Sequence, residues 1–145
     1  MTVRIPAALL QQINAHCEAA YPEEGAGFLL GRLQGDERVV TDILGLPNAR
    51  EDEARRNRYL LSARDVAQAE DEADRRGLSL LGVFHSHPDC PNTPSEFDRQ
   101  WAMPWFSYLI MRVDKGRTTS WLSWRLSDDR SRFDEEALIV EETEG

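Results

Sequence analysis

Two histidines, a serine and an aspartate lie close together in the segment from His85 to Asp98. The segment reads HSHPDCPNTPSEFD, so His85 and His87 are two residues apart, and Ser95 and Asp98 follow at a short fixed distance. Two imidazoles and one carboxylate are the ligand set of catalytic zinc sites, where water takes the fourth position. The pattern therefore predicts a zinc centre with His85, His87 and Asp98 as its ligands.

The expected local structure brings these side chains together. His85 and His87 end a strand predicted over residues 78–87, and the period of two directs both rings to the same side. Pro88 ends that strand, and the prolines of the following loop stiffen it. Ser95 begins a predicted helix over residues 95–103. Asp98 then lies one turn into this helix and can face back toward the histidines.

Each part of the pattern also has an interpretation without a metal. A His-x-His pair at the end of a strand arises by chance in many proteins. Ser95 and Asp98 read equally as the N-cap and third residue of a helix. The two features at this offset arise together very rarely given average residue usage, which favours metal binding.

The remaining patterns predict one mixed α/β domain, residues 1–145, with a central sheet flanked by two or three helices. In the strand 78–87, alternation places Leu81, Val83 and the histidines on one face, and Leu80 and Phe84 on the other. The other predicted elements are a helix over 6–20, strands over 25–31 and 38–46, a surface loop over 48–58, a helix from Ser62 to Gly77, a hairpin of 106–113 with 118–126, and a last edge element over 133–142.

Composition excludes several classes of function. The net charge is −9, which disfavours binding to nucleic acid, because phosphate contacts need a basic surface. No apolar run is long enough to span a bilayer, and the N-terminal residues do not resemble a signal peptide, so we expect a cytoplasmic protein without membrane contact. The two cysteines, Cys17 and Cys90, do not form a disulfide framework or a Cys-x-x-Cys zinc site.

The arrangement of His85, His87, Ser95 and Asp98 resembles the signature of the JAMM, or MPN-plus, zinc metallopeptidases. Upstream, residues 24–31 read EGAGFLLG, which is similar to the stretch that carries the catalytic glutamate of this family. The resemblance implies that Glu24 is the general base and that Ser95 stabilises the oxyanion. Glu23 falls one position out of register. Without the resemblance, Glu23 and Glu24 read as a solvated pair before a strand.

Three further segments, LPNA at 46–49, RYL at 58–60 and AMPWFSY at 102–108, look like the short bacterial branch of the family. That branch implies a cytidine-deaminase-like α/β fold. It also implies hydrolysis of an amide bond at the C-terminal glycine of a small ubiquitin-like, sulfur-carrier protein. Little room remains between Asp98 and Phe106 for the substrate-binding insertion of eukaryotic deubiquitinases, which makes a preference for a ubiquitin-chain linkage doubtful.

Three residues near the motif have open roles. Cys90 stands close enough to the predicted zinc to act as an adventitious ligand, and the simpler interpretation is a loop cysteine without a role. Trp101 and Trp105 either line a groove for the substrate tail or serve in packing, and packing is the favoured interpretation.

Two other functions fit parts of the sequence. A non-catalytic, MPN-type protein-interaction module lacks one or more of the ligands, and this chain lacks none. A nucleoside-type zinc deaminase carries a Pro-Cys-x-x-Cys element, which is absent here. The sequence does not identify the carrier protein, the leaving group or the oligomeric state.

Overall fold

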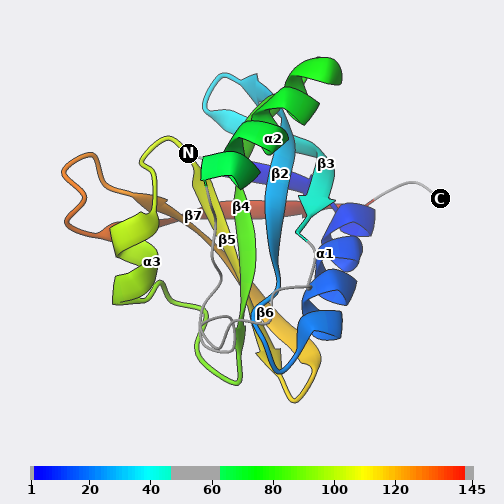
Figure 1. Ribbon diagram of the computed structural model, residues 1–145, viewed down its shortest axis with the longest axis vertical. Helices are drawn as coiled ribbons and strands as arrows, with labels where there is room; N and C mark the ends of the chain where they lie inside the picture. Colours follow the sequence, from blue (N-terminus) through cyan, green and yellow to red (C-terminus); the bar gives the residue numbers. More distant parts are fainter. Residues whose placement is uncertain (1, 47–62, 143–145) are drawn as a thin grey trace.

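The computed structural model describes residues 2–46 and 63–142, apart from the side chains of Phe97 and Trp101. Figure 1 shows a curved sheet with a long helix on one side and two helices on the other. In chain order the elements are β1 (Thr2–Pro6), α1 (Ala7–Ala20), β2 (Ala26–Gln34), β3 (Glu37–Gly45), α2 (Ala63–Arg75), β4 (Ser79–Pro88), α3 (Glu96–Trp101), β5 (Ser107–Asp114), β6 (Arg117–Leu126) and β7 (Phe133–Glu141). None of these helices is long and apolar enough to cross a membrane.

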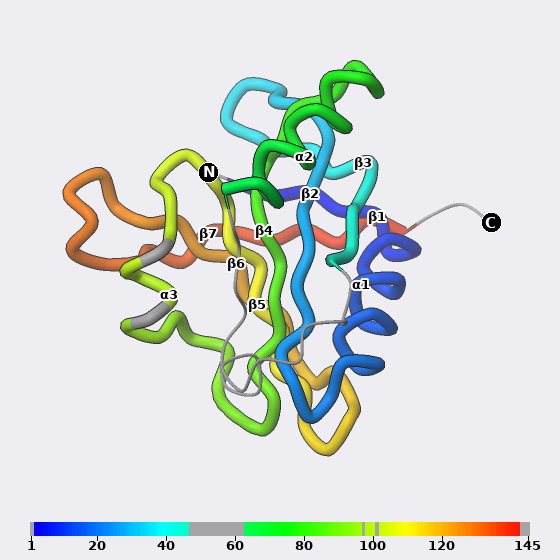
Figure 2. The backbone as a smooth tube through the Cα atoms, viewed as in Figure 1, coloured from blue at the N-terminus to red at the C-terminus, as the bar shows by residue number. Residues whose placement is uncertain are grey.

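The strands pair in the order β1-β3-β2-β4-β5-β6-β7, and β7 returns to β1 to close a barrel. The sheet is mixed, as predicted: β1 is parallel to β3 and β7, β4 is parallel to β5, and the other pairs are antiparallel. The tube in Figure 2 follows the two hairpins, β2–β3 and β5–β6, which were both predicted. The loop predicted over 48–58 and the helix start at Ser62 lie outside the described residues.

The expectation of an edge element over 133–142 is wrong. β7 pairs with β6 on one side and with β1 on the other, where Thr2 lies opposite Ala137 and Pro6 opposite Glu141. The sequence pattern did not predict β1, because this strand has only five residues and runs directly into α1. The unpredicted strand turns the expected flanked sheet into a closed one.

Two apolar clusters hold the helices on the sheet. The first lies beneath α1 and joins it to most of the strands. The second lies on the opposite face, where Ala69 of α2 and Ala102, the C-cap of α3, pack on β2, β4 and β5. The buried members of the first cluster are Val3, Ile5, Leu10, Ile13, Cys17, Leu29, Val40, Leu81, Phe84, Leu109, Met111 and Val113. Burial of apolar surface on both faces makes β4 the interior strand that its apolar sequence predicts.

β4 contains an irregularity that reverses part of the predicted alternation. The pairing with β2 shifts between Leu29, opposite Gly82, and Leu30, opposite Leu80. One extra residue in β4 therefore lies between these two pairs, as in a β-bulge. As a result Leu81 packs with Phe84 beneath α1, and Leu80 packs with Val83 on the face of α2. Beyond the bulge, alternation continues and leaves His85 on the side of Val83.

Candidate metal centre

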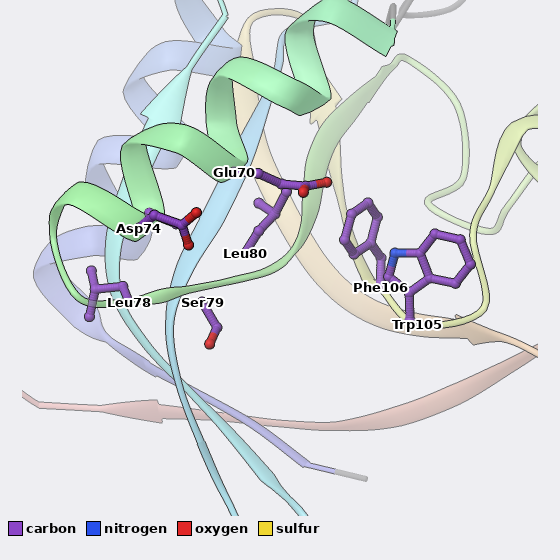
Figure 3. Close-up of a pocket in the computed structure, with 8 residues that line it drawn as sticks. Glu70, Asp74, Leu78, Ser79, Leu80, Trp105 and Phe106 are labelled. Carbon is purple, nitrogen blue, oxygen red and sulfur yellow. The ribbon is translucent and has the colours of Figure 1, made fainter.

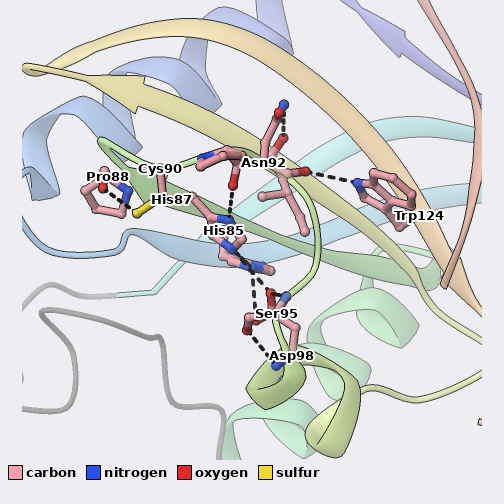
Figure 4. Close-up of polar contacts among 10 residues, drawn as sticks. His85, His87, Pro88, Cys90, Asn92, Ser95, Asp98 and Trp124 are labelled. Atoms are coloured by element: carbon pink, nitrogen blue, oxygen red, sulfur yellow. Dashed lines mark hydrogen bonds and ion pairs between the residues drawn. The ribbon is translucent and has the colours of Figure 1, made fainter. Parts of the chain in front are cut away.

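The three predicted ligands meet at the end of β4, as Figure 4 shows. The two Nε2 atoms of His85 and His87 are 3.2 Å apart. Asp98 places Oδ1 3.3 Å from His85 Nε2 and Oδ2 3.2 Å from His87 Nε2. Two atoms that bind one zinc ion tetrahedrally at about 2.0–2.2 Å are about 3.3–3.6 Å apart. The two Nε2 atoms therefore already have nearly the spacing that zinc requires, and each has one oxygen of Asp98 at a similar distance. The three residues form a group that could hold a metal ion.

Burial and charge set the protonation of this group. Burial lowers the pKa of His85, which is fully buried, below its ordinary value and favours the neutral ring. Burial also opposes charge on His87, but contacts with Asp98, Pro91 and the charge of Glu24 outweigh it and raise the pKa of that ring. For Asp98, burial is outweighed by both histidines and by the Ser95 amide, so its pKa lies well below the usual range. The site thus keeps an anionic carboxylate.

The loop after β4 fixes the tautomer of His87. His87 Nδ1 lies 2.7 Å from the carbonyl oxygen of Pro91, so the Nδ1–H donates there and the Nε2 lone pair faces the centre. The loop itself is anchored on the sheet. The Asn92 amide donates to the Ile110 carbonyl at 3.3 Å, and the Trp124 indole donates to the Asn92 carbonyl at 3.1 Å. Predicted stiffness therefore comes from hydrogen bonds as well as from prolines.

Ser95 and Asp98 form the capping box that the sequence predicts. The Asp98 amide donates to Ser95 Oγ at 3.0 Å, and the Ser95 amide donates to Asp98 Oδ2 at 2.8 Å. The helix cap and the predicted ligand role are therefore compatible, because the same box orients the Asp98 carboxylate toward the histidines. Ser95 Oγ accepts a bond in the box, which leaves its own proton available to donate.

Glu24 precedes β2 and lies across from β4. Ala26 pairs with His85, and the Gly25 peptide is bonded to Ser86 at both ends: Gly25 N–H donates to Ser86 Oγ at 2.9 Å, and Ser86 N–H donates to the Gly25 carbonyl at 3.0 Å. One further step of this antiparallel register sets Glu24 opposite His87. Residues opposite each other share a face of the sheet. Glu24 is half-buried, and its charge acts on His87.

Arg130 is a residue near the site that sequence patterns did not reveal. It comes from the turn between β6 and β7 and donates from Nη1 to the Ala102 carbonyl at 2.8 Å. Its Nη2 donates to the carbonyls of Gln100 at 3.1 Å and Arg99 at 3.3 Å. A cation at the C-terminus of a helix satisfies its last carbonyls and complements its dipole. α3 is therefore held by the capping box at its start and by Arg130 at its end.

The structure describes the side chains of two of the three residues whose roles the sequence left open, Cys90 and Trp105. Cys90 is exposed, its thiol donates to the Pro88 carbonyl at 3.1 Å, and it is not part of the group formed by the two histidines and Asp98. Trp105 lies outside the core with 60% of its surface exposed. Its ring meets that of Phe106 edge-on, with the two ring centroids 5.9 Å apart.

The chain is similar to several known proteins. Residues 6–127 match the family described as prokaryotic homologs of the JAB domain. A protein of Thermus thermophilus named "Probable TtuB-protein conjugate cleaving protease" is 32% identical over 117 residues, which cover 79% of this chain and 72% of the relative. A "Desampylase" of Pyrococcus furiosus is 25% identical over 83 residues, covering 57% of this chain and 56% of the relative.

Solved structures share the architecture. The solution structure of a protein from Desulfitobacterium hafniense superposes with a TM-score of 0.83 at 29% identity, covering 97% of this chain and 94% of that one. A JAB1/MPN domain protein from Archaeoglobus fulgidus superposes with a TM-score of 0.58 at 19% identity, covering 96% of this chain and 99% of that one. The second likeness concerns the fold alone.

Proposed function

Because the chain belongs to the family of prokaryotic homologs of the JAB domain, we propose that it is a zinc-dependent peptidase or isopeptidase. Its substrate is a small ubiquitin-like, sulfur-carrier protein, and the bond cleaved is an amide at the C-terminal glycine of that carrier. The observation that carries the proposal is that two histidine Nε2 atoms and the two oxygens of the Asp98 carboxylate converge with separations of 3.2–3.3 Å, and that a second carboxylate, Glu24, lies on the same face. The names of the two relatives, a conjugate-cleaving protease and a desampylase, support the substrate class.

The residues divide the chemistry among them. His85, His87 and Asp98 would hold the zinc, and the bound ion would supply the Lewis acidity that activates water and polarises the scissile carbonyl. Glu24 takes a proton from the attacking water at its carboxylate and returns it to the leaving amine. Ser95 Oγ–H donates to the carbonyl oxygen as that oxygen gains negative charge, and a single such donor contributes about 3–4 kcal/mol to lowering the barrier.

The test is cleavage of a conjugate in which a ubiquitin-like carrier encoded in the same genome is joined through its C-terminal glycine to an amine. Mass spectrometry of the products should show the free carrier and the free amine. The protein should contain about one zinc per chain, lose activity with a chelator and regain it with added zinc.

Glu24→Gln separates metal binding from catalysis. This variant should keep its zinc, and its kcat should fall about 10²–10⁴-fold, which is the range for loss of a general base. The matched control is Glu23→Gln, since Glu23 is adjacent but out of register, and it should remain active. Full activity of Glu24→Gln would contradict the role of Glu24. Absence of zinc and of cleavage in protein purified without chelators would instead support the non-catalytic interaction module.

The resemblance, together with the composition and charge of the sequence, supports three finer proposals. Residues 1–145 form one catalytic domain, the fold is related to that of cytidine deaminases, and the protein acts in the cytoplasm, without nucleic-acid or membrane partners. Limited proteolysis of the whole chain would test the first of these, since a single domain should resist cleavage from β1 through β7.

A further inference from the structure

A pocket of about 330 Å³ lies at the end of β4 opposite the metal centre, between α2 and the loop before β5. Figure 3 shows Glu70 and Asp74 projecting from α2 on one side, and Trp105 with Phe106 on the other. Leu78 and Leu80 contribute apolar surface at the start of β4. The pocket thus combines two carboxylates with an aromatic wall.

The two carboxylates do not serve the stability of α2. Glu70 and Asp74 are four residues apart, where like charges destabilise a helix, and Asp74 lies in the last turn, where the helix dipole disfavours an anion. The nearby arginines are engaged elsewhere: Arg75 and Arg76 both pair with Glu72, and Arg76 also pairs with Asp42. Among the described residues, no ion pair joins Glu70 or Asp74 to a cation of the chain.

In the aromatic wall Phe106 is buried, whereas Trp105 is exposed on a backbone that is held in place. Trp105 keeps 60% of its surface in solvent, although large aromatic side chains gain most from burial. Its carbonyl accepts a hydrogen bond from Arg38 Nη2 at 2.7 Å, and the Pro104 carbonyl accepts one from Arg125 Nη2 at 3.0 Å. Two arginines from the sheet therefore fix the backbone of this loop. A partner that binds Trp105 then avoids the entropic cost of ordering the loop.

We propose that this pocket binds a lysine or arginine side chain on the folded body of the ubiquitin-like substrate while its C-terminal tail lies at the metal centre. The proposal rests on the proposed function. A basic side chain matches the pocket on both counts, because its cation pairs with carboxylates and also binds over the face of a tryptophan. A partner with basic surface is also favoured by the net charge of −9.

The spacing along β4 suits a single small protein that reaches both sites. Leu80 packs with Val83 on the face of α2, and His85 continues on that face, so the pocket and the metal centre lie on the same side of the sheet. From Ser79 to His85 the strand rises by about 20 Å. A globular body of about 80 residues has a radius of gyration near 12 Å, so it spans this separation.

The experiment compares two double variants. The pocket variant carries Glu70→Gln and Asp74→Asn. The control carries Asp71→Asn and Glu135→Gln, which change the net charge equally at exposed positions outside the pocket. Two substrates are used. The first is the whole ubiquitin-like carrier joined through its C-terminal glycine to a fluorescent amine. The second is a peptide of the last residues of that carrier, joined to the same amine. For the whole carrier, the pocket variant should raise KM about 5- to 10-fold with unchanged kcat and zinc content, and the control should remain within about 2-fold of wild type. The difference should vanish at about 1 M salt, where the Debye length is about 3 Å.

The outcomes separate the two proposals. If wild-type enzyme cleaves neither the carrier nor the peptide, the proposed function fails. If it cleaves both, and the pocket variant and the control behave alike on the whole carrier, the pocket is not a docking site. Equal loss on carrier and peptide would also overturn the proposal, because the carboxylates would then act on the catalytic site itself. Trp105→Ala should reproduce the selective rise in KM.

Discussion

The two ends of β4 use carboxylates in opposite ways. At the metal end, Asp98 is buried, shares hydrogen bonds with Ser95 and touches both histidines. At the pocket end, Glu70 and Asp74 are exposed on α2 and have no ion-pair partner within the described part of the chain. A buried charge must be compensated within the fold, whereas an exposed charge is compensated by water or by a partner. This difference underlies the proposal that one end of β4 carries the chemistry and the other end recognises the substrate.

The largest effect is expected from Asp98→Ala. Loss of this carboxylate leaves two histidines without their anionic partner, so zinc should be lost and kcat/KM should fall by at least about 10³-fold. Metal analysis of the purified variant together with turnover on the conjugate measures both. Glu96→Ala is the control, since Glu96 is an exposed residue of the same helix that pairs with Arg99. Zinc retained at full occupancy in Asp98→Ala would remove the contrast between the two ends.

Ser95 caps α3, and substitution can separate this observed role from its proposed role as oxyanion donor. Ser95→Gly should lower kcat by about 10²–10³-fold through loss of the hydroxyl donor. Its free energy of unfolding should fall by only a few tenths of a kcal/mol, because glycine is tolerated at an N-cap. Ser95→Thr keeps both hydroxyl and cap and should retain most of the activity. Denaturant titration measures the free energy of unfolding, and steady-state kinetics on the same samples measures kcat. If Ser95→Gly were fully active, only the capping role of Ser95 would remain.

Arg130→Ala tests whether the end of α3 positions the ligand at its start. Without the guanidinium, three carbonyls at the C-terminus of α3 lose their donor, and we expect the zinc affinity to fall about 10- to 100-fold, as for other groups that orient metal ligands. Competition with a chelator measures the affinity. Arg132→Ala is the matched control, because Arg132 pairs with Asp134 at the surface of the same turn. Unchanged zinc affinity together with a lower melting temperature would mean that Arg130 serves stability alone.

The smallest effect is expected at the pocket end. Asp74→Asn should raise the free energy of unfolding by about 0.3–1 kcal/mol, because it removes an anion from the last turn of α2 and a like-charge contact with Glu70. Thermal unfolding of the zinc-loaded protein measures it, with Asp71→Asn as the control. A destabilised Asp74→Asn would show that the carboxylate has a structural partner, and the contrast between the two ends of β4 would weaken.

Much of the site was readable because its residues are close in sequence. His85, His87, Ser95 and Asp98 lie on one strand, one loop and one helix turn, and local geometry alone makes the two rings converge and builds the capping box. The hairpins were predicted for the same reason, since each depends on a turn between neighbouring apolar runs. Glu24 was identified from family resemblance, and the structure adds the register that sets it opposite His87.

Tertiary structure alone decided the rest. The closure of the barrel depends on β1, whose five residues gain a strand conformation only by pairing with β3 and β7. The bulge that exchanges the faces of Leu80 and Leu81 depends on how β2 pairs with β4. Contacts between segments far apart in the chain form both the cap of α3 by Arg130 and the pocket of Glu70, Asp74 and Trp105. The periodicity of a short stretch of sequence cannot predict such contacts. The sequence by itself determined which residues can do chemistry, because ligand type and spacing are local properties; packing determined how they are held and where a partner can bind.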